Sequence, residues 1–236
     1  MAAPVEVGFK EVSLEGPAVG RFYETPRPGE AGHRRAVLCV GGVGGGWDSP
    51  AAGLYPQLCG ELAGRGAARG LRVRFRFPTS VAECSADVIS GLRFLADNGV
   101  TDAALLGHSL GGAVVVAAAA AAAAMPPPRT PTVRAVVTLA TQLAGATAPA
   151  AQLPPATYLL AIHAADDAVL SPACSERLVR AATLLPASHK TLRLLPAGGH
   201  GLQGGGAEAA VRAAVDPLLA QALLDAPPTP PGEGAP

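Results

Sequence analysis

Residues 107–111 read Gly-His-Ser-Leu-Gly, a Gly-x-Ser-x-Gly pattern that can hold a serine at the tip of a sharp turn. The residues before it are apolar, as in a short buried strand, and those after it favour a helix. A turn of this kind forces Ser109 into a sparsely populated backbone conformation and exposes its hydroxyl. Gly107 and Gly111 are expected because a Cβ there would collide with neighbouring backbone. Ser109 is therefore a candidate nucleophile, and an ordinary glycine-rich turn is the alternative.

A serine hydroxyl needs a base to take its proton, and a histidine held by a carboxylate suits this role near neutral pH. Asp167 and His200 follow Ser109 in the chain, each just after a predicted strand. Asp166 is the competing acid, but we favour Asp167 because the turn at 168–172 would lock it against the sheet. His200 stands between glycines in a loop, where a buried structural histidine is not expected.

The remaining histidines are not assigned to catalysis. His163 at a strand end and His108 inside the serine turn are expected to make structural hydrogen bonds, whereas His33 and His189 are expected at the surface. No set of histidines has the spacing of metal ligands. We therefore expect no metal site and no cofactor.

The segment 41–50, Gly-Gly-Val-Gly-Gly-Gly-Trp-Asp-Ser-Pro, is the second informative stretch. It follows the continuous apolar run 36–40, which is typical of a strand buried on both faces. Runs of glycine let backbone N–H groups face a bound anion. We favour a functional loop over a flexible linker, because linkers do not usually begin at the end of a buried strand.

The elements that must position these residues alternate between strand and helix from 36 to 224, which predicts a doubly wound, mostly parallel α/β sheet flanked by helices. Functional loops of such sheets gather at the carboxyl ends of the strands, and four candidate loops lie at such ends. The predicted strands are 6–14 and 19–23 as an antiparallel hairpin, then 36–40, 71–77, 103–106, 133–140, 157–162 and 191–195. The predicted helices are 54–68 with Gly70 as its stop, 80–98 capped by Thr79 or Ser80, 109–125 ended by prolines 126–128, 172–184 and 207–224.

The predicted strand 71–77 alternates Arg72, Arg74 and Arg76 with apolar residues, which is unusual for a central strand. Either the arginine stems carry their charged ends to solvent, or Arg76 reaches the rim of the site and meets an acidic substrate. We favour the first interpretation.

Length and composition describe one ordinary globular domain over 1–224, with a Pro/Gly-rich tail at 225–236 predicted to be disordered. The net charge of zero gives no electrostatic reason for binding nucleic acid and little protection from self-association, so a monomer or weak homo-oligomer is expected. The four scattered cysteines predict reduced core thiols. No signal or transit sequence is recognised, and the longest apolar run, 113–125, is too short to cross a bilayer, so a soluble cytoplasmic protein is expected.

Together these motifs resemble the α/β-hydrolase superfamily, in a compact form without a cap domain, similar to the dienelactone-hydrolase-like and serine-aminopeptidase-like branches. The matching stretches are Gly-His-Ser-Leu-Gly-Gly at 107–112, His-Ala-Ala-Asp-Asp-Ala-Val-Leu at 163–170 and Pro-Ala-Gly-Gly-His-Gly-Leu at 196–202. The resemblance covers roughly 18–224. It departs from the family where Gly41 replaces the histidine of the His-Gly-x-x-Gly oxyanion loop, and where serine replaces the cysteine of true dienelactone hydrolases.

By this resemblance Ser109 is the nucleophile, Asp167 the acid and His200 the base. The backbone amides of Val43 and Leu110 would form the oxyanion hole, with substrate binding assigned to the site residues Gly42, Gly44 and Trp47.

The function expected is that of a carboxylesterase-like serine hydrolase, which cleaves a small-molecule ester, thioester or small amide through an acyl-serine. A catalytically silent α/β-hydrolase scaffold that binds a partner is the alternative. A membrane-associated lipase is disfavoured by the short connection at 141–156. Carbon–carbon hydrolases and haloperoxidase-like enzymes use the same three residues, so these activities stay open.

Overall fold

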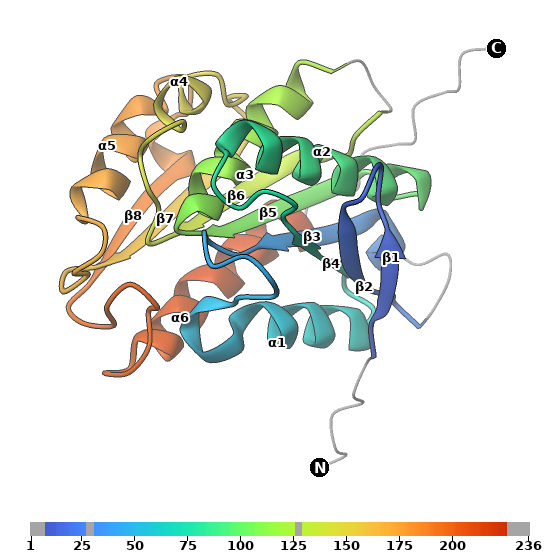
Figure 1. The fold of residues 1–236 in the computed structure, drawn as a ribbon, viewed down its shortest axis with the longest axis horizontal. Coiled ribbons are helices and arrows are strands. Elements are labelled where there is room, and N and C mark those ends of the chain that lie inside the picture. Colours follow the sequence, from blue (N-terminus) through green and yellow to red (C-terminus); the bar gives the residue numbers. More distant parts are fainter. Residues whose placement is uncertain (1–7, 27–30, 126–128, 226–236) are drawn as a thin grey trace.

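The computed structural model describes residues 8–26, 31–125 and 129–225. Its single sheet has the strand order β1-β2-β4-β3-β5-β6-β7-β8 (Figure 1). The strands are β1 (Lys10–Ser13), β2 (Val19–Tyr23), β3 (Arg35–Val40), β4 (Arg69–Arg74), β5 (Asp102–His108), β6 (Thr132–Leu139), β7 (Tyr158–Ala164) and β8 (Lys190–Leu195). The helices are α1 (Pro50–Gly64), α2 (Val81–Asp97), α3 (Leu110–Ala123), α4 (Thr147–Ala150), α5 (Ala173–Ala181) and α6 (Ala207–Leu219), with 3₁₀ turns η1 (Ala31–Arg34) and η2 (Ala187–His189) and a π-helical turn η3 (Ala220–Leu224).

The strands β3 to β8 pair in parallel, whereas β2 pairs antiparallel with both β1 and β4. Both the doubly wound, mostly parallel sheet and the opening antiparallel hairpin predicted from the sequence are therefore confirmed. The predicted tail and the proline run that should end α3 lie outside the described residues.

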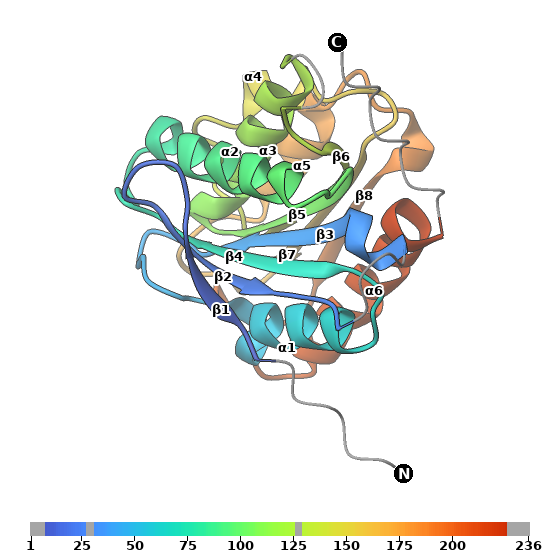
Figure 2. The same cartoon turned by 90° about the vertical axis from the view of Figure 1, so that its right-hand side faces the viewer.

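Helices cover both faces of the sheet, with α2, α3 and α5 on one side and α1 and α6 on the other (Figures 1 and 2). Each layer has its own apolar core. Leu92 of α2 packs in the first, and Leu58 of α1 and Val211 of α6 pack in the second. Helix α3 is apolar on every side because it lies between α2 and the sheet, and its alanines allow close packing there.

Helix α1 and strand β4 differ from their predicted bounds. The helix ends at Gly64, and Gly66, at a left-handed φ of 71°, follows its end. Glycine takes this conformation without a Cβ penalty, which makes it a common residue just beyond a helix. Gly70, the predicted stop, lies inside β4, where an added Cβ would be 2.5 Å from the Cβ of Cys59. The connection 141–156 also contains the short helix α4.

Candidate active site

Ser109 stands at a strained turn between β5 and α3, with φ of 56° and ψ of −118°. Its amide donates to the carbonyl of Leu139, 2.9 Å away, which ties the turn to the neighbouring strand. A Cβ on Gly107 would lie 2.1 Å from the carbonyl oxygen of Gly111, and one on Gly111 would lie 2.3 Å from that of Gly41. Neither position accepts a side chain without movement of backbone, as predicted, and the strained serine conformation is confirmed as well.

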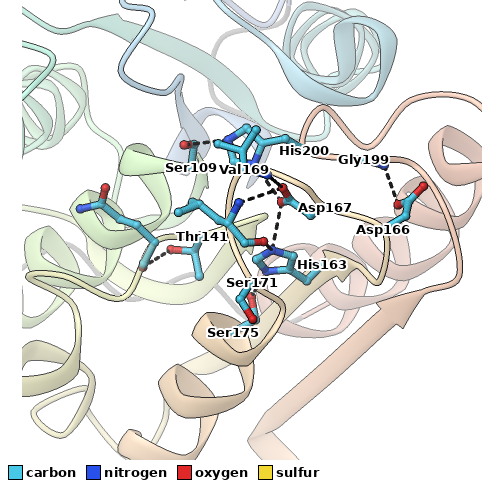
Figure 3. A network of polar contacts seen from close by, with 12 residues as sticks. Ser109, Thr141, His163, Asp166, Asp167, Val169, Ser171, Ser175, Gly199 and His200 are labelled. Carbon is cyan, nitrogen blue, oxygen red and sulfur yellow. Dashed lines mark hydrogen bonds and ion pairs between the residues drawn. The ribbon is translucent and has the colours of Figure 1, made fainter.

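Three residues from three loops form one hydrogen-bonded chain at the carboxyl edge of the sheet (Figure 3). The Nε2 atom of His200 lies 3.0 Å from Oγ of Ser109, and its Nδ1 lies 2.8 Å from Oδ2 of Asp167. The loop after β8 carries His200, and the loop after β7 carries Asp167. The Asp167 side chain is fully buried, whereas that of His200 is one-fifth exposed. The structure thus brings together the three residues that the sequence motifs single out.

The carboxylate of Asp167 is held at both oxygens. Its Oδ1 accepts the amides of Val169, at 2.8 Å, and Leu170, at 2.9 Å. Burial by itself raises the pKa of Asp167, but the hydrogen bonds from His200 and from these two amides outweigh it, so the pKa lies below its ordinary value. The carboxylate is therefore ionised at neutral pH and can stabilise an imidazolium at His200.

Asp166, the competing acid, has a different position. It is exposed, and its carboxylate accepts the amides of Gly199, at 2.8 Å, and Gly198, at 3.3 Å (Figure 3). These contacts fix the backbone just before His200. Asp166 thus supports the loop that carries the histidine, and Asp167 contacts the imidazole itself.

His108 holds the same loop from the serine turn. Its Nε2 lies 2.8 Å from the backbone carbonyl of His200, and because a carbonyl can only accept, Nε2 carries the proton. Burial lowers the pKa of His108, so this ring stays neutral to a lower pH than an ordinary histidine does. The structural hydrogen bond expected of His108 is present.

The glycine loop 41–50 approaches the nucleophile with its backbone. A Cβ on Gly42 would lie 3.1 Å from the Cβ of Ser109, so this residue passes directly beside the serine. The side chain of Val43 is mostly exposed, and Leu110 is the first residue of α3. A Cβ on Gly44 would meet the Asp48 carboxylate at 2.5 Å. The oxyanion-hole assignment of Val43 and Leu110, and the substrate-binding assignment of Gly42 and Gly44, stay predictions.

Trp47 packs on a group of arginines beside the glycine loop. Its ring lies under the guanidinium of Arg21 at 4.3 Å, and its carbonyl accepts a hydrogen bond from Arg72. These contacts anchor the loop to the sheet, while a role of Trp47 in substrate binding stays a prediction. Arg72 is only 5% exposed, so the expectation that the arginines of this strand reach solvent is wrong for it.

Arg76 is held by the fully buried carboxylate of Asp87, which accepts both its backbone amide, at 2.9 Å, and its side chain. Glu83 lies 3.7 Å from the same guanidinium. Arg76 therefore joins the end of β4 to α2, and its charge is already balanced inside the protein. This contact favours the structural interpretation of Arg76 over contact with an acidic substrate.

Two contacts of the site carry no sequence signal. The hydroxyl of Ser175, on α5, bonds the buried His163, and the amide of Gln142 donates to the carbonyl of Ser109 at 3.2 Å. Neither residue belongs to a recognisable motif. Only the fold, by placing α5 and the loop after β6 beside the site, could reveal them.

The four cysteines are free thiols, three of them buried. Within the described ranges, no group of three acidic, histidine or cysteine side chains could hold a metal ion. Across the same residues, no helix has both the length and the apolar character that a membrane span requires.

Comparisons with known proteins agree on the fold. Neither a family profile nor a curated protein matches the chain. Among solved structures, alpha/beta hydrolase domain-containing protein 10 from mouse is similar with a TM-score of 0.65 at 14% identity, covering 91% of this chain and 99% of its own. XC6422 from Xanthomonas campestris, described as an a/b serine hydrolase without lid, has a TM-score of 0.63 at 17% identity, covering 94% and 97%. Esterase 2 of Thermogutta terrifontis has a TM-score of 0.66 at 18% identity, covering 97% and 96%. The chain therefore has the α/β-hydrolase fold, in the form that carries no cap domain.

Proposed function

We propose that this protein is a serine hydrolase that cleaves a carboxylic ester, a thioester or a small amide through an acyl-serine. The observation that carries the proposal is the unbroken hydrogen-bonded chain from Ser109 Oγ through His200 to Asp167, at 3.0 and 2.8 Å. This order of contacts is the one in which a serine, a base and an acid act together in catalysis.

In the first step, Ser109 Oγ attacks the carbonyl carbon while His200 Nε2 takes the hydroxyl proton. Asp167 holds His200 Nδ1–H and stabilises the imidazolium that forms. The carbonyl oxygen becomes an oxyanion, for which the amides of Val43 and Leu110 are the proposed donors. His200 then gives its proton to the leaving group. Water, activated by the same histidine, attacks the acyl-serine and releases the acid.

The surroundings of the site support an apolar, uncharged substrate. Bulky apolar side chains are exposed at the carboxyl ends of three strands, namely Val43 after β3, Phe77 after β4 and Val169 after β7. A shallow hollow of about 350 Å³ is lined by residues between Leu143 and Pro149. Its first lining residue, Leu143, directly follows Gln142, whose backbone amide donates to the carbonyl of Ser109. We therefore assign an apolar acyl or alcohol group to this side of the site.

Names of structural neighbours add support of a weaker kind. Esterase 2 of Thermogutta terrifontis is recorded as phosphorylated by paraoxon, and several other neighbours are named esterases or hydrolases. At 14–18% identity the likeness itself shows only the shared fold, so the neighbours' activities enter here as part of the proposal. The silent-scaffold alternative is less favoured because serine, histidine and aspartate are all present in hydrogen-bonding geometry.

A fluorophosphonate probe tests the proposal directly. We expect it to label the protein at Ser109, and we expect Ser109→Ala to lose both labelling and turnover of p-nitrophenyl esters. Ser188→Ala, in η2 before β8, is the matched control and should label normally. Labelling at another serine, or none in the folded protein, would contradict the hydrolase assignment. A series of p-nitrophenyl esters of increasing acyl length then tests the apolar acyl group.

A further inference from the structure

The acid of the site has a second histidine as partner. Oδ2 of Asp167 lies 2.8 Å from Nδ1 of His200 and 3.1 Å from Nε2 of His163 (Figure 3). With the amides of Val169 and Leu170 on Oδ1, the carboxylate accepts hydrogen bonds from four groups. The two imidazoles therefore share one oxygen of the carboxylate.

His163 is fixed at both ends of its ring. It lies at the end of β7 and is fully buried. Its Nδ1 lies 2.7 Å from Oγ of Ser175 on α5, while its Nε2 also lies 3.1 Å from the carbonyl of Leu170. A carbonyl and a carboxylate both only accept, so Nε2 must carry the proton. In the neutral ring, Nδ1 then accepts the hydroxyl proton of Ser175.

We propose that His163 is a positioning residue of this hydrolase, which acts on the reaction through Asp167, and this inference rests on the proposed function. It does so in two ways. First, its Nε2–H fixes the rotation of the carboxylate, so that the lone pair of Oδ2 is aimed at His200. Second, it draws charge from the same oxygen, which limits how tightly Asp167 holds the proton on His200 during turnover. No direct contact of His163 with Ser109 or a substrate is needed.

The titratable groups that face Asp167 and its two histidines, His163 and His200, are the following. His163 faces Asp167 from β7. His108 faces His200 from the serine turn, and the centroids of these two imidazole rings lie 4.9 Å apart. Asp48 and Asp167 both raise the pKa of His108, but burial of the ring lowers it by more. Asp166 bonds the backbone on the other side of the histidine loop. A change at His163 should therefore be read out mainly by His200.

Two replacements separate positioning from mere packing. His163→Leu removes the donor and fills the buried position with an apolar side chain. His163→Gln keeps an amide N–H near the position of Nε2. We expect His163→Leu to lower kcat about tenfold, the size of one hydrogen bond to a charged group, with little change in KM. We also expect the acid limb of the pH profile of kcat/KM to move up by about half a pH unit, because Asp167 then holds the proton on His200 more tightly.

Rescue of kcat by glutamine distinguishes a positioning role of His163 from a role in packing alone. His163→Gln should recover most of kcat and return the acid limb toward that of the natural protein, and His189→Leu, a histidine replacement before β8, should change neither. Ser175→Ala, which frees the far end of the ring, should give an intermediate loss. Wild-type kcat and pH profile in His163→Leu would overturn the proposal, as would a loss of kcat with an unmoved acid limb and no rescue by glutamine.

Nuclear magnetic resonance of ¹⁵N-histidine-labelled protein keeps this test separate from the proposed function, since it needs no turnover. The intact protein should show His163 with Nε2 protonated and Nδ1 not. The Nδ1–H resonance of His200 should shift in His163→Leu and return in His163→Gln. An unmoved resonance would overturn the positioning role even if the protein is an active hydrolase. Shifts as expected in a protein that no fluorophosphonate labels would instead reject only the hydrolase assignment.

Discussion

The acid and base loops of the site and its glycine loop are built on opposite principles. Side chains hold the first region, where His163, Asp167 and His200 form a hydrogen-bonded chain and the Asp166 carboxylate accepts the backbone amide of Gly199. Backbone dominates the second, in which Gly42 passes beside Ser109 and the side chain of Val43 is left mostly exposed. The contrast indicates where the chain tolerates change. The first region should be sensitive to the identity of single side chains, and the second to the course of the backbone.

Asp167→Asn should have the largest effect and breaks the side-chain region at its centre. Loss of the carboxylate that fixes the imidazole should lower kcat on the order of 10⁴-fold. Asp166→Asn is the matched control, and because its amide oxygen can still accept from the Gly199 amide, the loss should be only a few-fold. Steady-state kinetics on one p-nitrophenyl ester compares the two. Equal losses, or the reverse order, would show that the acid is misassigned.

Val43→Pro tests the backbone region. Proline removes the amide N–H proposed to bind the oxyanion, so kcat should fall on the order of 10²–10³-fold. Val43→Ala keeps the amide and changes only an exposed side chain, so it should be nearly neutral. Circular dichroism of both variants checks that the loop replacement leaves the fold intact. If Val43→Pro leaves kcat unchanged, another residue of the loop must supply the oxyanion donor.

His108→Leu, which removes the donor at Nε2, sharpens the comparison where the serine turn meets the histidine loop. Loss of one hydrogen bond to the His200 carbonyl should lower kcat roughly fivefold. Because burial lowers the pKa of His108 in the folded protein, the unfolded chain takes up a proton there at a higher pH than the folded chain does. The stability that the neutral, buried ring of His108 contributes is complete above about pH 6.5 and decreases as the pH falls further. Thermal unfolding of His108→Leu should therefore depend less on pH below that point, whereas the matched control His189→Leu should keep the natural slope.

The cysteines should matter least, because they belong to neither region. Burial raises the pKa of Cys84 to about 12, and that of Cys39 well above its ordinary value, so these thiols are poor nucleophiles. In the folded protein a thiol reagent should modify Cys174 alone, the cysteine that is partly exposed. Cys174→Ala should abolish that modification and leave kcat unchanged. A mass change on reduction of the native protein would instead reveal a disulfide.

Much of the fold follows from local pattern. Ser109, Asp167 and His200 each follow a strand, and parallel strands place such positions on one edge. The sharp start of α2 is also local, since the Ser80 hydroxyl accepts the amide of Glu83 as a cap should. These features depend on neighbours in sequence, which is why they could be predicted.

Other features depend on contacts that the sequence does not display. Ala51 and Ala52 have φ near 50°, which alanine rarely adopts, and the Ala51 amide is held there by the carbonyl of Gly201. The start of α1 is therefore set by the histidine loop, 150 residues away in the chain. Arg72 is likewise buried by contacts remote in sequence, among them its hydrogen bond to the Trp47 carbonyl of the glycine loop. The bond between His163 and Ser175 depends on the placement of α5.

The order of the elements along the chain also sets the order in which the parts of the site are made. Ser109 precedes His200 by 91 residues, and at ribosomal rates of about 5–20 residues per second the nucleophile is made roughly 5–20 s before its base. The histidine loop follows β8, which lies at the edge of the sheet and, among the described strands, pairs with β7 alone. A nascent chain can thus assemble the turn and the centre of the sheet while its serine still lacks a proton acceptor. The proton acceptor becomes available only after β8 and the loop that follows it have been made, so the order of synthesis delays the nucleophilicity of Ser109.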